Sequence, residues 1–549
     1  MKLNEGKTKT VVISTKPSDT DWKPTLQLNG KSVDTVPSHK FLGVQIDNKL
    51  RFPEHIEETV RRCTKRVNVL KCLGGKDWGQ SLESQRKVYL TLIRTCIEYA
   101  SSSWWPWIAD TAKKKLQRVQ NAGLKAMASL ASRCPTDFIH LETGIEPLCV
   151  RMGKNDLIMR DKYRRLPEDD ERRRLLEKVA PVSLKTRYGW RHSTDFEKDL
   201  LSTATFKNTG IRIKPWETFA NVKLQKVQLE KKKAEYQPLE LQTISNQQIA
   251  EVDADFYIFT DGSTSGNQEK GGAGVCVEDS KGHPVAEFRQ PAGARCSSYG
   301  GECVAMHTAA TWIESKEIES ERPVSFMILT DSESLVNSLA NKTWKVKDEW
   351  LLRVKDTLTR INSQVTIMWI PSHCGIEGNE RADQLANAGA LMSQDDIPVT
   401  HAITKAKIKA RKWQIEHPRA KAMYGERRRP REEIEKRWPR SVRTLYGRLR
   451  TGHAKELNYY QHKLHNIDSP NCEVCNEIES IEHVLTKCPT LSGARAKHWP
   501  TDVDVSMLVT HPEVCRQILA HRFPKLKYRN KDETNPRMNA PNEEGNQSL

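Results

Sequence analysis

The chain has 549 residues, 37% hydrophobic and 29% charged, which is enough for three or four domains of about 150 residues each. Lys and Arg number 88 against 70 Asp and Glu, and the net charge of +18 favours a polyanionic partner, nucleic acid before membrane, although charge also serves solubility. No apolar run is long enough for a bilayer, the N-terminus has no secretory signal, and the 13 cysteines argue against a disulfide framework, so we expect a nuclear or cytoplasmic protein.

The first 180 residues divide into two regions. Residues 1–50 predict short strands and turns, with a β-branched run at 10–13 and a buried strand at 41–44 (Phe-Leu-Gly-Val). Residues 51–180 predict helices, because apolar residues such as Val67 and Leu70 recur at helical spacing. The tryptophans near residue 105 favour a packed core over a platform for stacking bases.

The remaining chain falls into segments of different composition. Residues 181–251 predict a linker, and residues 252–391 have mixed α/β patterning. Residues 400–460 form a basic helical segment, in which residues 401–450 hold 17 Lys and Arg against 5 Glu, a net of +12. The tail from 525 to 549 has the composition of a disordered segment.

Two predicted strands end in an aspartate. Residues 256–260 (Phe-Tyr-Ile-Phe-Thr) predict a buried strand that leads into Asp261, and residues 325–330 predict another that ends at Asp331. Between them, residues 274–277 and 285–288 predict the other strands of an antiparallel meander. Further strands and helices are predicted at residues 334–340, 349–361 and 365–370.

Two predicted helices carry an acid near their start. Glu302 follows two glycines on the first turn of one helix, and Asp383 lies in a helix that begins near Asn379. Taken singly, each acid is more simply a turn residue or a helix cap. Because strand ends and helix starts gather on one side of an α/β layer, the four together predict one carboxylate cluster.

A cluster of four carboxylates requires cations, because like charges resist ionisation together. Oxygen ligands select Mg²⁺, with Mn²⁺ as an alternative. Two such ions about 3.5–4 Å apart can activate a water molecule and stabilise a leaving oxygen.

This segment resembles the ribonuclease H family. The matching motifs are Thr260-Asp261-Gly262-Ser263, Gly301-Glu302, Thr330-Asp331-Ser332 and residues 371–383, which begin Pro-Ser-His and end in Asp383. The resemblance covers about a quarter of the chain. It implies a five-stranded mixed sheet with flanking helices, and hydrolysis of the RNA strand of RNA–DNA hybrids.

The resemblance also implies roles for individual residues. Asp261 would bridge two Mg²⁺ ions, Glu302 and Asp331 would hold one ion, and Asp383 the other. His373 would lie on a mobile loop and assist proton transfer or product release. Substrate contacts are expected at four positions, Gly262, Ser263, Ser332 and Glu333.

The sequence departs from the family in two places. Glu333 stands where many members carry Gln, and its charge would weaken affinity for a hybrid, although it can still accept a hydrogen bond from a 2′-hydroxyl. Only 41 residues separate Asp331 from His373, which leaves little room for the basic insertion that some members use to grip the hybrid.

A second constellation, at residues 468–490, has the spacing of a zinc knuckle. Cys472, Cys475, His483 and Cys488 supply the number and types of ligand for one tetrahedral, structural Zn²⁺, and the alternative is chance spacing of reduced thiols. In the basic stretch before it, residues 437–450 interleave arginine with Trp438 and Tyr446. This pattern suits phosphate contact and base stacking, or equally a solvated helix face.

The order of these parts resembles the C-terminal portion of a non-LTR retrotransposon polyprotein of the I or Jockey type. Residues 3–9 and 41–44 are similar to the end of its reverse transcriptase palm, and residues 51–180, with Ile97-Glu98-Tyr99-Ala100, to its thumb. Neither Asp169-Asp170 nor Asp395-Asp396 fits a polymerase site, so we expect a fragment without polymerase activity.

Three hypotheses follow for the function. The first is a Mg²⁺-dependent ribonuclease H, the second an inactive nucleic-acid-binding remnant of the polyprotein, and the third a protein-interaction module with the same fold. The presence of all four acids and of His373 favours the enzyme. The sequence does not specify an oligomeric state.

Overall fold

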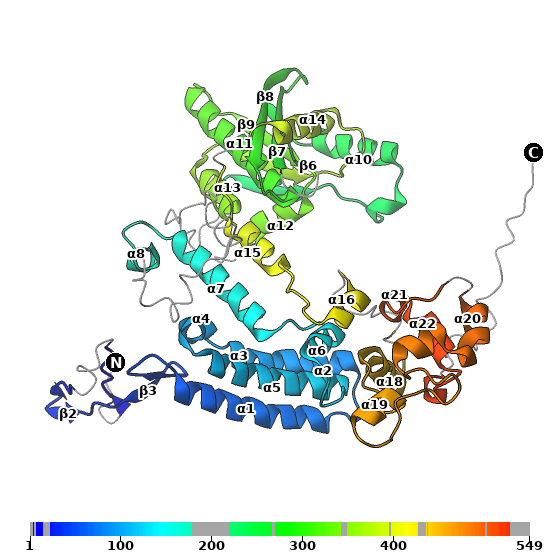
Figure 1. Cartoon of the computed structure of the whole chain (residues 1–549). Helices are drawn as coiled ribbons and strands as arrows, with labels where there is room; N and C mark the ends of the chain where they lie inside the picture. Colours follow the sequence, from blue (N-terminus) through cyan, green and yellow to red (C-terminus); the bar gives the residue numbers. More distant parts are fainter. Residues whose placement is uncertain are drawn as a thin grey trace, which may run out of the picture. The chain divides into compact units, whose positions relative to one another are not determined.

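The chain forms two compact units, which Figure 1 shows in a computed structural model. The structure describes residues 4, 7–14, 22–177, 219–265, 270–341, 348–394, 397–425, 435, 437–499 and 502–527. Unit 1 comprises Met1–Asn155, Thr186–Gly189 and Lys412–Leu549, and unit 2 comprises Asp156–Lys185 and Trp190–Arg411. Three predicted features, residues 181–218 of the linker, the Asp395-Asp396 pair and the tail from residue 528, lie outside the described residues.

Unit 2 is built on a six-stranded mixed sheet, with strand order β5-β10-β9-β6-β7-β8. The strands β6, β7 and β8 form an antiparallel meander, and β6, β9, β10 and β5 are parallel neighbours. The strands are β5 (Val222–Lys226), β6 (Phe256–Ser265), β7 (Lys270–Asp279), β8 (Pro284–Gly293), β9 (Ser325–Thr330) and β10 (Gln364–Trp369).

Helices cover both faces of this sheet. Two hydrophobic clusters form, one beneath α11, α12 and α13 and the other beneath α10 and the start of α14. The helices of unit 2 are α8 (Glu171–Glu177), the short η7 (Lys233–Glu235), α10 (Pro238–Ala250), α11 (Ser298–Glu319), α12 (Glu333–Ala340), α13 (Glu349–Arg360), α14 (Glu377–Leu391) and α15 (His401–Ala410). Helix α7 (Leu148–Arg164) runs across the boundary between the two units.

Helix α14 lies directly on the backbone of β7. A Cβ added to Gly272 would lie 1.9 Å from the Ala386 carbonyl oxygen, and one on Gly274 would lie 2.0 Å from that of Ala382. Only glycine therefore allows this approach. The close packing fixes the helix that carries Asp383 against the sheet.

The predicted five-stranded sheet and the predicted linker are both wrong in one segment. Residues 222–226 form β5, which pairs in parallel with β10 as a sixth strand, and residues 238–250 form α10. Val222 and Leu224 pack partly buried against the sheet's hydrophobic cluster. Val222 and Leu224 are too short an apolar pattern to identify a strand from sequence, because the strand depends on its pairing with a distant partner.

Unit 1 begins with two small hairpins and a set of helices. Its elements before residue 155 are β1 (Leu26–Leu28), β2 (Lys31–Val33), β3 (Ser38–Phe41), β4 (Val44–Asp47), α1 (Pro53–Cys72), α2 (Leu82–Val88), η3 (Tyr89–Arg94), α3 (Thr95–Glu98), α4 (Ser101–Trp104), η4 (Trp105–Trp107), α5 (Asp110–Ala128) and α6 (Thr136–Thr143). Trp104 and Trp105 are buried, as predicted.

The predicted buried strand at residues 41–44 is wrong. Phe41 ends β3, Val44 begins β4, and Leu42 and Gly43 between them have φ values of +46° and +87°. Two consecutive positive φ angles are typical of a tight hairpin turn. Phe41 and Leu42 are exposed there, so their apolar character does not mark a core.

The second half of unit 1 lies after residue 412. Its elements are α16 (Pro418–Tyr424), α18 (Arg440–Thr451), α19 (Asn458–Lys463), η8 (His483–Lys487), η9 (Pro489–Leu491), α20 (Ser492–His498), α21 (Met507–Thr510), α22 (Pro512–Leu519) and η10 (Pro524–Leu526). One hydrophobic cluster joins these helices to those before residue 155. Among the described residues, no helix combines the length and apolar composition needed to cross a bilayer.

Candidate active site

Two of the four predicted acids directly follow residues that pair across neighbouring parallel strands. Asp331 comes directly after β9, as predicted, whereas Asp261 lies within β6, which continues to Ser265 and does not end at this aspartate. Thr260 of β6 pairs with Thr330 of β9, and each is followed by an aspartate, Asp261 and Asp331. Trp369, at the end of the next strand β10, donates a hydrogen bond from its indole Nε1 to the Asp331 carbonyl oxygen, at 3.0 Å. The backbone around both aspartates is therefore fixed by the sheet.

Helix α11 brings Glu302 to the same place. The side chain of Ser297 caps the helix by accepting a hydrogen bond from the Gly300 N–H at 3.1 Å. A Cβ on Gly262 would lie 2.1 Å from the Glu302 nitrogen, so the first turn of the helix rests on β6 directly after Asp261. Glycine at position 262 is required for this contact.

Three of the four predicted acids lie in one cluster, and the fourth, Asp383, lies next to Asp261. Ligand oxygens of Asp261, Glu302 and Asp331 all lie within 4.8 Å of one another. Asp383, on α14, is in hydrogen-bonding contact with Asp261 and accepts a second hydrogen bond from Asn387 Nδ2 at 3.1 Å. Asp261 and Glu302 are buried, and Asp331 and Asp383 are partly buried.

The electrostatics of this cluster favour a bound cation. Burial and then the neighbouring carboxylates raise the pKa of Asp261 and of Glu302 well above the usual range, and burial raises the pKa of Asp331. Glu302 Oε2 is buried and has no hydrogen-bond partner among the described residues. An orphaned carboxylate oxygen beside two further carboxylates fits the oxygen-ligand set of a hard divalent ion.

His373 lies on an exposed loop between β10 and α14. Its φ of +54° is in the left-handed region, which an ordinary side chain adopts rarely. Burial raises the pKa of Asp331, and the nearby charge of His373 acts in the opposite direction. The histidine is thus close enough to the cluster to interact electrostatically with one of its acids.

The predicted substrate contacts lie around the same cluster. Gly262 and Ser263 follow Asp261 in β6, and the Ser263 hydroxyl donates a hydrogen bond to Asn387 Oδ1. Ser332 precedes helix α12, which Glu333 begins. Glu333 Oε1 accepts a hydrogen bond from Lys226 Nζ at 2.7 Å, which lowers the pKa of the carboxyl.

Sequence reasoning missed this lysine partner, because residue 226 lay in the presumed linker. The ion pair offsets the additional charge of Glu333, the first of the two departures from the family pattern.

The comparisons with known proteins agree with this geometry. Residues 253–391 match the family model described as RNase H. A ribonuclease H of Nitrosomonas eutropha is 33% identical over 147 residues, which cover 24% of this chain and 87% of the bacterial protein. The chain belongs to the ribonuclease H family.

The ribonuclease H domain is also similar to parts of longer proteins. The probable RNA-directed DNA polymerase from transposon BS of Drosophila melanogaster is 23% identical over 140 residues, which span 26% of this chain and 15% of that protein. A putative 115 kDa protein of the Drosophila retrotransposable element R1DM is 25% identical over 126 residues, which span 12% of its length. A solved structure, the LC11 RNase H1 isolated from compost, matches with 24% identity and a TM-score of 0.22, over 25% of this chain and 96% of that one.

The predicted zinc ligands also lie together, in unit 1. One ligand atom from each of Cys472, Cys475, His483 and Cys488 lies within 4.8 Å of the others, and the Cys472 and Cys488 sulfurs are 3.9 Å apart. That separation is close to the roughly 3.8 Å expected between two sulfurs on one tetrahedral zinc with Zn–S bonds of about 2.3 Å.

The histidine of this group is held as in many zinc sites. His483 Nδ1 lies 2.9 Å from Glu477 Oε2, which leaves Nε2 directed toward Cys475. Three thiols and an imidazole within this distance fit a structural Zn²⁺.

The basic stretch before these ligands differs from both predicted interpretations. Trp438, Tyr446 and Arg450 are buried in the core of unit 1, so their rings and guanidinium are neither free to stack on bases nor part of a solvated face. Arg450 Nε donates to Glu142 Oε1 at 2.6 Å, and Arg450 Nη1 donates to Glu435 Oε1 at 2.8 Å. Charge spacing in the sequence does not show that a cation has buried partners.

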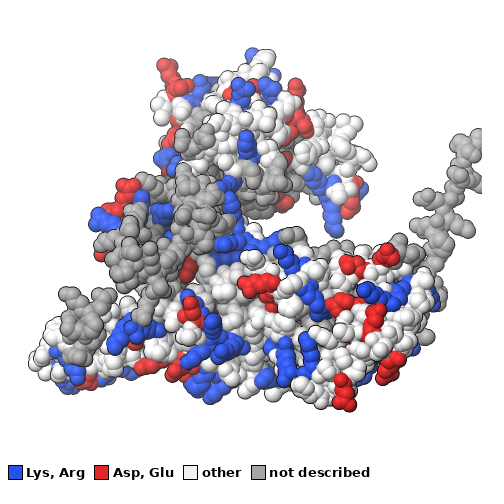
Figure 2. Space-filling view, viewed as in Figure 1, with Lys and Arg blue, Asp and Glu red and all other residues white. Residues whose placement is uncertain are grey.

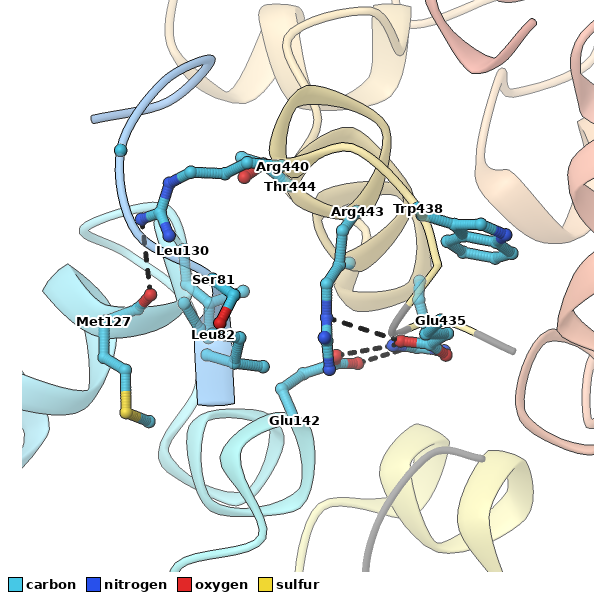
Figure 3. Close-up of a pocket in the computed structure, with 14 residues that line it drawn as sticks. Ser81, Leu82, Met127, Leu130, Glu142, Glu435, Trp438, Arg440, Arg443 and Thr444 are labelled. Atoms are coloured by element: carbon cyan, nitrogen blue, oxygen red, sulfur yellow. Dashed lines mark hydrogen bonds and ion pairs between the residues drawn. The ribbon is translucent and has the colours of Figure 1, made fainter. Parts of the chain in front are cut away.

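A cavity of about 180 Å³ lies beside this ion pair, and Figure 3 shows Glu142 and Glu435 joined by dashed lines to arginines of α18. On the face of unit 1 in Figure 2, basic and acidic side chains are interspersed.

Proposed function

We propose that residues 253–391 form a Mg²⁺-dependent endonuclease that hydrolyses the RNA strand of RNA–DNA hybrids. The observation that carries this proposal is the largely buried cluster in which oxygens of Asp261, Glu302 and Asp331 lie within 4.8 Å of one another. Membership of the ribonuclease H family supports the same reaction.

The four acids would serve as ligands for two metal ions. Asp261 is central to the cluster and would contact two ions, Glu302 and Asp331 would complete the site of one, and Asp383 would hold the other. When bound, Mg²⁺ or Mn²⁺ supplies an activated water and stabilises the leaving oxygen. The burial of Asp261 and Glu302 keeps bulk water away from these oxygens and strengthens their interaction with a cation.

The residues around the pocket would position the substrate. Gly262 and Ser263 flank the first acid, and Ser332 and Glu333 follow the third. The Glu333 carboxylate can accept a hydrogen bond from a 2′-hydroxyl, the group that distinguishes RNA from DNA. His373 is exposed and interacts electrostatically with Asp331, and it would exchange a proton with solvent as product leaves.

Cleavage of a hybrid labelled on its RNA strand tests the proposal. With Mg²⁺ present, Asp261→Asn and Asp331→Asn should each lower the rate by more than about 100-fold, the upper range for loss of a metal ligand's supporting partner. The matched control is Glu319→Gln, an exposed acid at the far end of α11, which should leave the rate unchanged. Equal cleavage by wild type and by both aspartate variants would reject the assignment.

We further propose that the chain derives from a non-LTR retrotransposon polyprotein, with a thumb-like region at residues 51–180 and one structural Zn²⁺ on Cys472, Cys475, His483 and Cys488. The similarity to two Drosophila transposon proteins supports the origin. The gathering of four zinc-type ligands in unit 1 supports the metal site.

A further inference from the structure

Strand β5, which precedes the residues matched by the family model, reaches the edge of the acid cluster. Its last residue, Lys226, pairs with Trp369 at the end of β10, and Trp369 is hydrogen-bonded to the Asp331 backbone. The chain that leaves β5 is therefore separated from Asp331 by a single strand, β10.

The turn after β5 places a second lysine at the site. Lys233 Nζ donates a hydrogen bond to Ser372 Oγ at 2.6 Å, and Ser372 directly precedes His373. Lys233 is exposed, and its charge acts on both Asp331 and Cys374. An ammonium group has three donors, of which Ser372 uses one.

Lys233 is held by a folded segment. The Lys231 N–H donates to the Tyr236 hydroxyl at 2.9 Å, which closes the turn around Lys233. Helix α10 then packs Leu241 into the cluster that contains Cys374 and Ile376, and Gln242 Nε2 donates to the Gly375 carbonyl oxygen. The lysine and the His373 loop are thus fixed to each other at several points.

We propose that Lys233 binds a phosphate of the nucleic acid at this site, so that the segment before the family-matched residues completes the substrate surface. This inference rests on the proposed nuclease function. A compact ammonium group forms charge-assisted bonds with phosphate oxygens from any direction. The interval between Asp331 and His373 leaves little room for a basic insertion that would bind the hybrid. Lys233 lies outside that interval in sequence and provides a cation next to His373.

A salt series of binding measurements tests the proposal. The full chain carrying Asp261→Asn, which should not cut, is titrated with fluorescent hybrid and compared with the same chain carrying Lys233→Gln in addition. We expect several-fold weaker binding and a decrease of about 1 in the slope of log affinity against log salt concentration, the signature of one lost phosphate contact.

Three matched variants separate phosphate binding from a structural role. Lys281→Gln removes an exposed lysine in the turn after β7, at the Phe256 end of β6, and should leave the slope unchanged. Ser372→Ala removes the hydrogen bond but keeps the ammonium group, and should also keep the slope. Lys233→Arg should restore it. A lower slope with Ser372→Ala, or an unchanged slope with Lys233→Gln, would overturn the inference.

Cleavage and binding by wild type, measured beside this series, separate the inference from the proposed function. If wild type cuts hybrid but Lys233→Gln binds like the Lys281→Gln control, only the role of Lys233 is wrong. If wild type neither cuts nor binds hybrid, both proposals are wrong.

Discussion

Glu302 shows most directly why the carboxylate cluster of the ribonuclease H domain favours a bound cation. Its side chain is 6% exposed, and Oε2 has no hydrogen-bond partner among the described residues. A buried carboxylate oxygen without a hydrogen-bond partner lowers the free energy of unfolding, and repulsion from neighbouring acids lowers it further. The arrangement is therefore unfavourable for the metal-free protein and favourable once a divalent cation neutralises the charge.

This strain leads to a prediction for Asp261→Asn. Removing one of the crowded carboxylates should raise the melting temperature of metal-free unit 2, by about 2–4 °C for each 1 kcal/mol of repulsion relieved. Mg²⁺ should stabilise wild type and stabilise the variant much less. Calorimetry with EDTA and with Mg²⁺ measures both effects, and the proposed metal site would be contradicted by equal stabilisation of the two proteins.

At the scale of elements, a buried ion-pair network joins α7 to α15 within unit 2. Asp161 is fully buried and accepts hydrogen bonds from Arg165 Nε at 2.8 Å and from His401 Nδ1 at 2.7 Å. Arg165 also donates to the Val399 carbonyl oxygen and to Thr404. One carboxylate thus holds the helix that enters unit 2 against the helix that leaves it.

The network predicts a stability that depends on pH. Burial alone would raise the pKa of Asp161, but hydrogen bonds from His401 and Arg165 outweigh it and lower this pKa below the usual value of an aspartate. The stabilisation is therefore complete above the unfolded-state pKa and is lost as pH falls through the lower folded-state pKa.

Asp161→Asn should destabilise unit 2 by about 3–5 kcal/mol at pH 7, because it leaves buried cations without their partner. The difference from wild type should shrink below about pH 4, near the unfolded-state pKa. Urea unfolding of wild type and variant at pH 7 and below about pH 4 gives the difference in free energy of unfolding at each pH. The interpretation does not survive if the variant and wild type have the same midpoint at pH 7.

The elements also show which parts of the fold the sequence could predict. The strands and helices from residue 256 to residue 391 were predicted because each has its own alternation, helical spacing or cap. The acids were predicted from their positions near the predicted ends of those elements, although the structure places Asp261 within β6 and Asp383 within α14. Strand β5 and the proximity of Lys233 to Ser372 depend on contacts across more than a hundred residues, and no local pattern records them.

At the scale of the whole molecule, unit 1 is discontinuous in sequence, and the chain of unit 2 is inserted into it. Residues before 155 and after 412 share one hydrophobic cluster. The buried Arg450 joins the two parts through Glu142 on α6, and it also pairs with Glu435 of its own part. The sequence suggested a separate basic segment and a separate zinc knuckle, because hydrophobic periodicity does not show which distant helices pack together.

The proposed zinc ligands are joined to this shared core. Val484 and Leu485, which follow His483 in η8, are buried in the cluster of unit 1. Glu479, fully buried beside the ligands, accepts hydrogen bonds from the Asn458 N–H at 3.0 Å and from Arg522 at 2.7 Å. Loss of the metal should therefore loosen unit 1 well beyond the knuckle.

Removal of zinc should affect one unit and spare the other. Purified protein should hold about one zinc per chain, as one Cys₃His set binds one ion. Cys488→Ser should lower this content and the melting temperature of unit 1, whereas hybrid cleavage by unit 2 continues. Cys515→Ser, which replaces a buried thiol of α22 outside the ligand set, is the matched control and should retain the metal. Zinc content near zero in wild type, or equal content in the two cysteine variants, would show that these thiols hold no zinc.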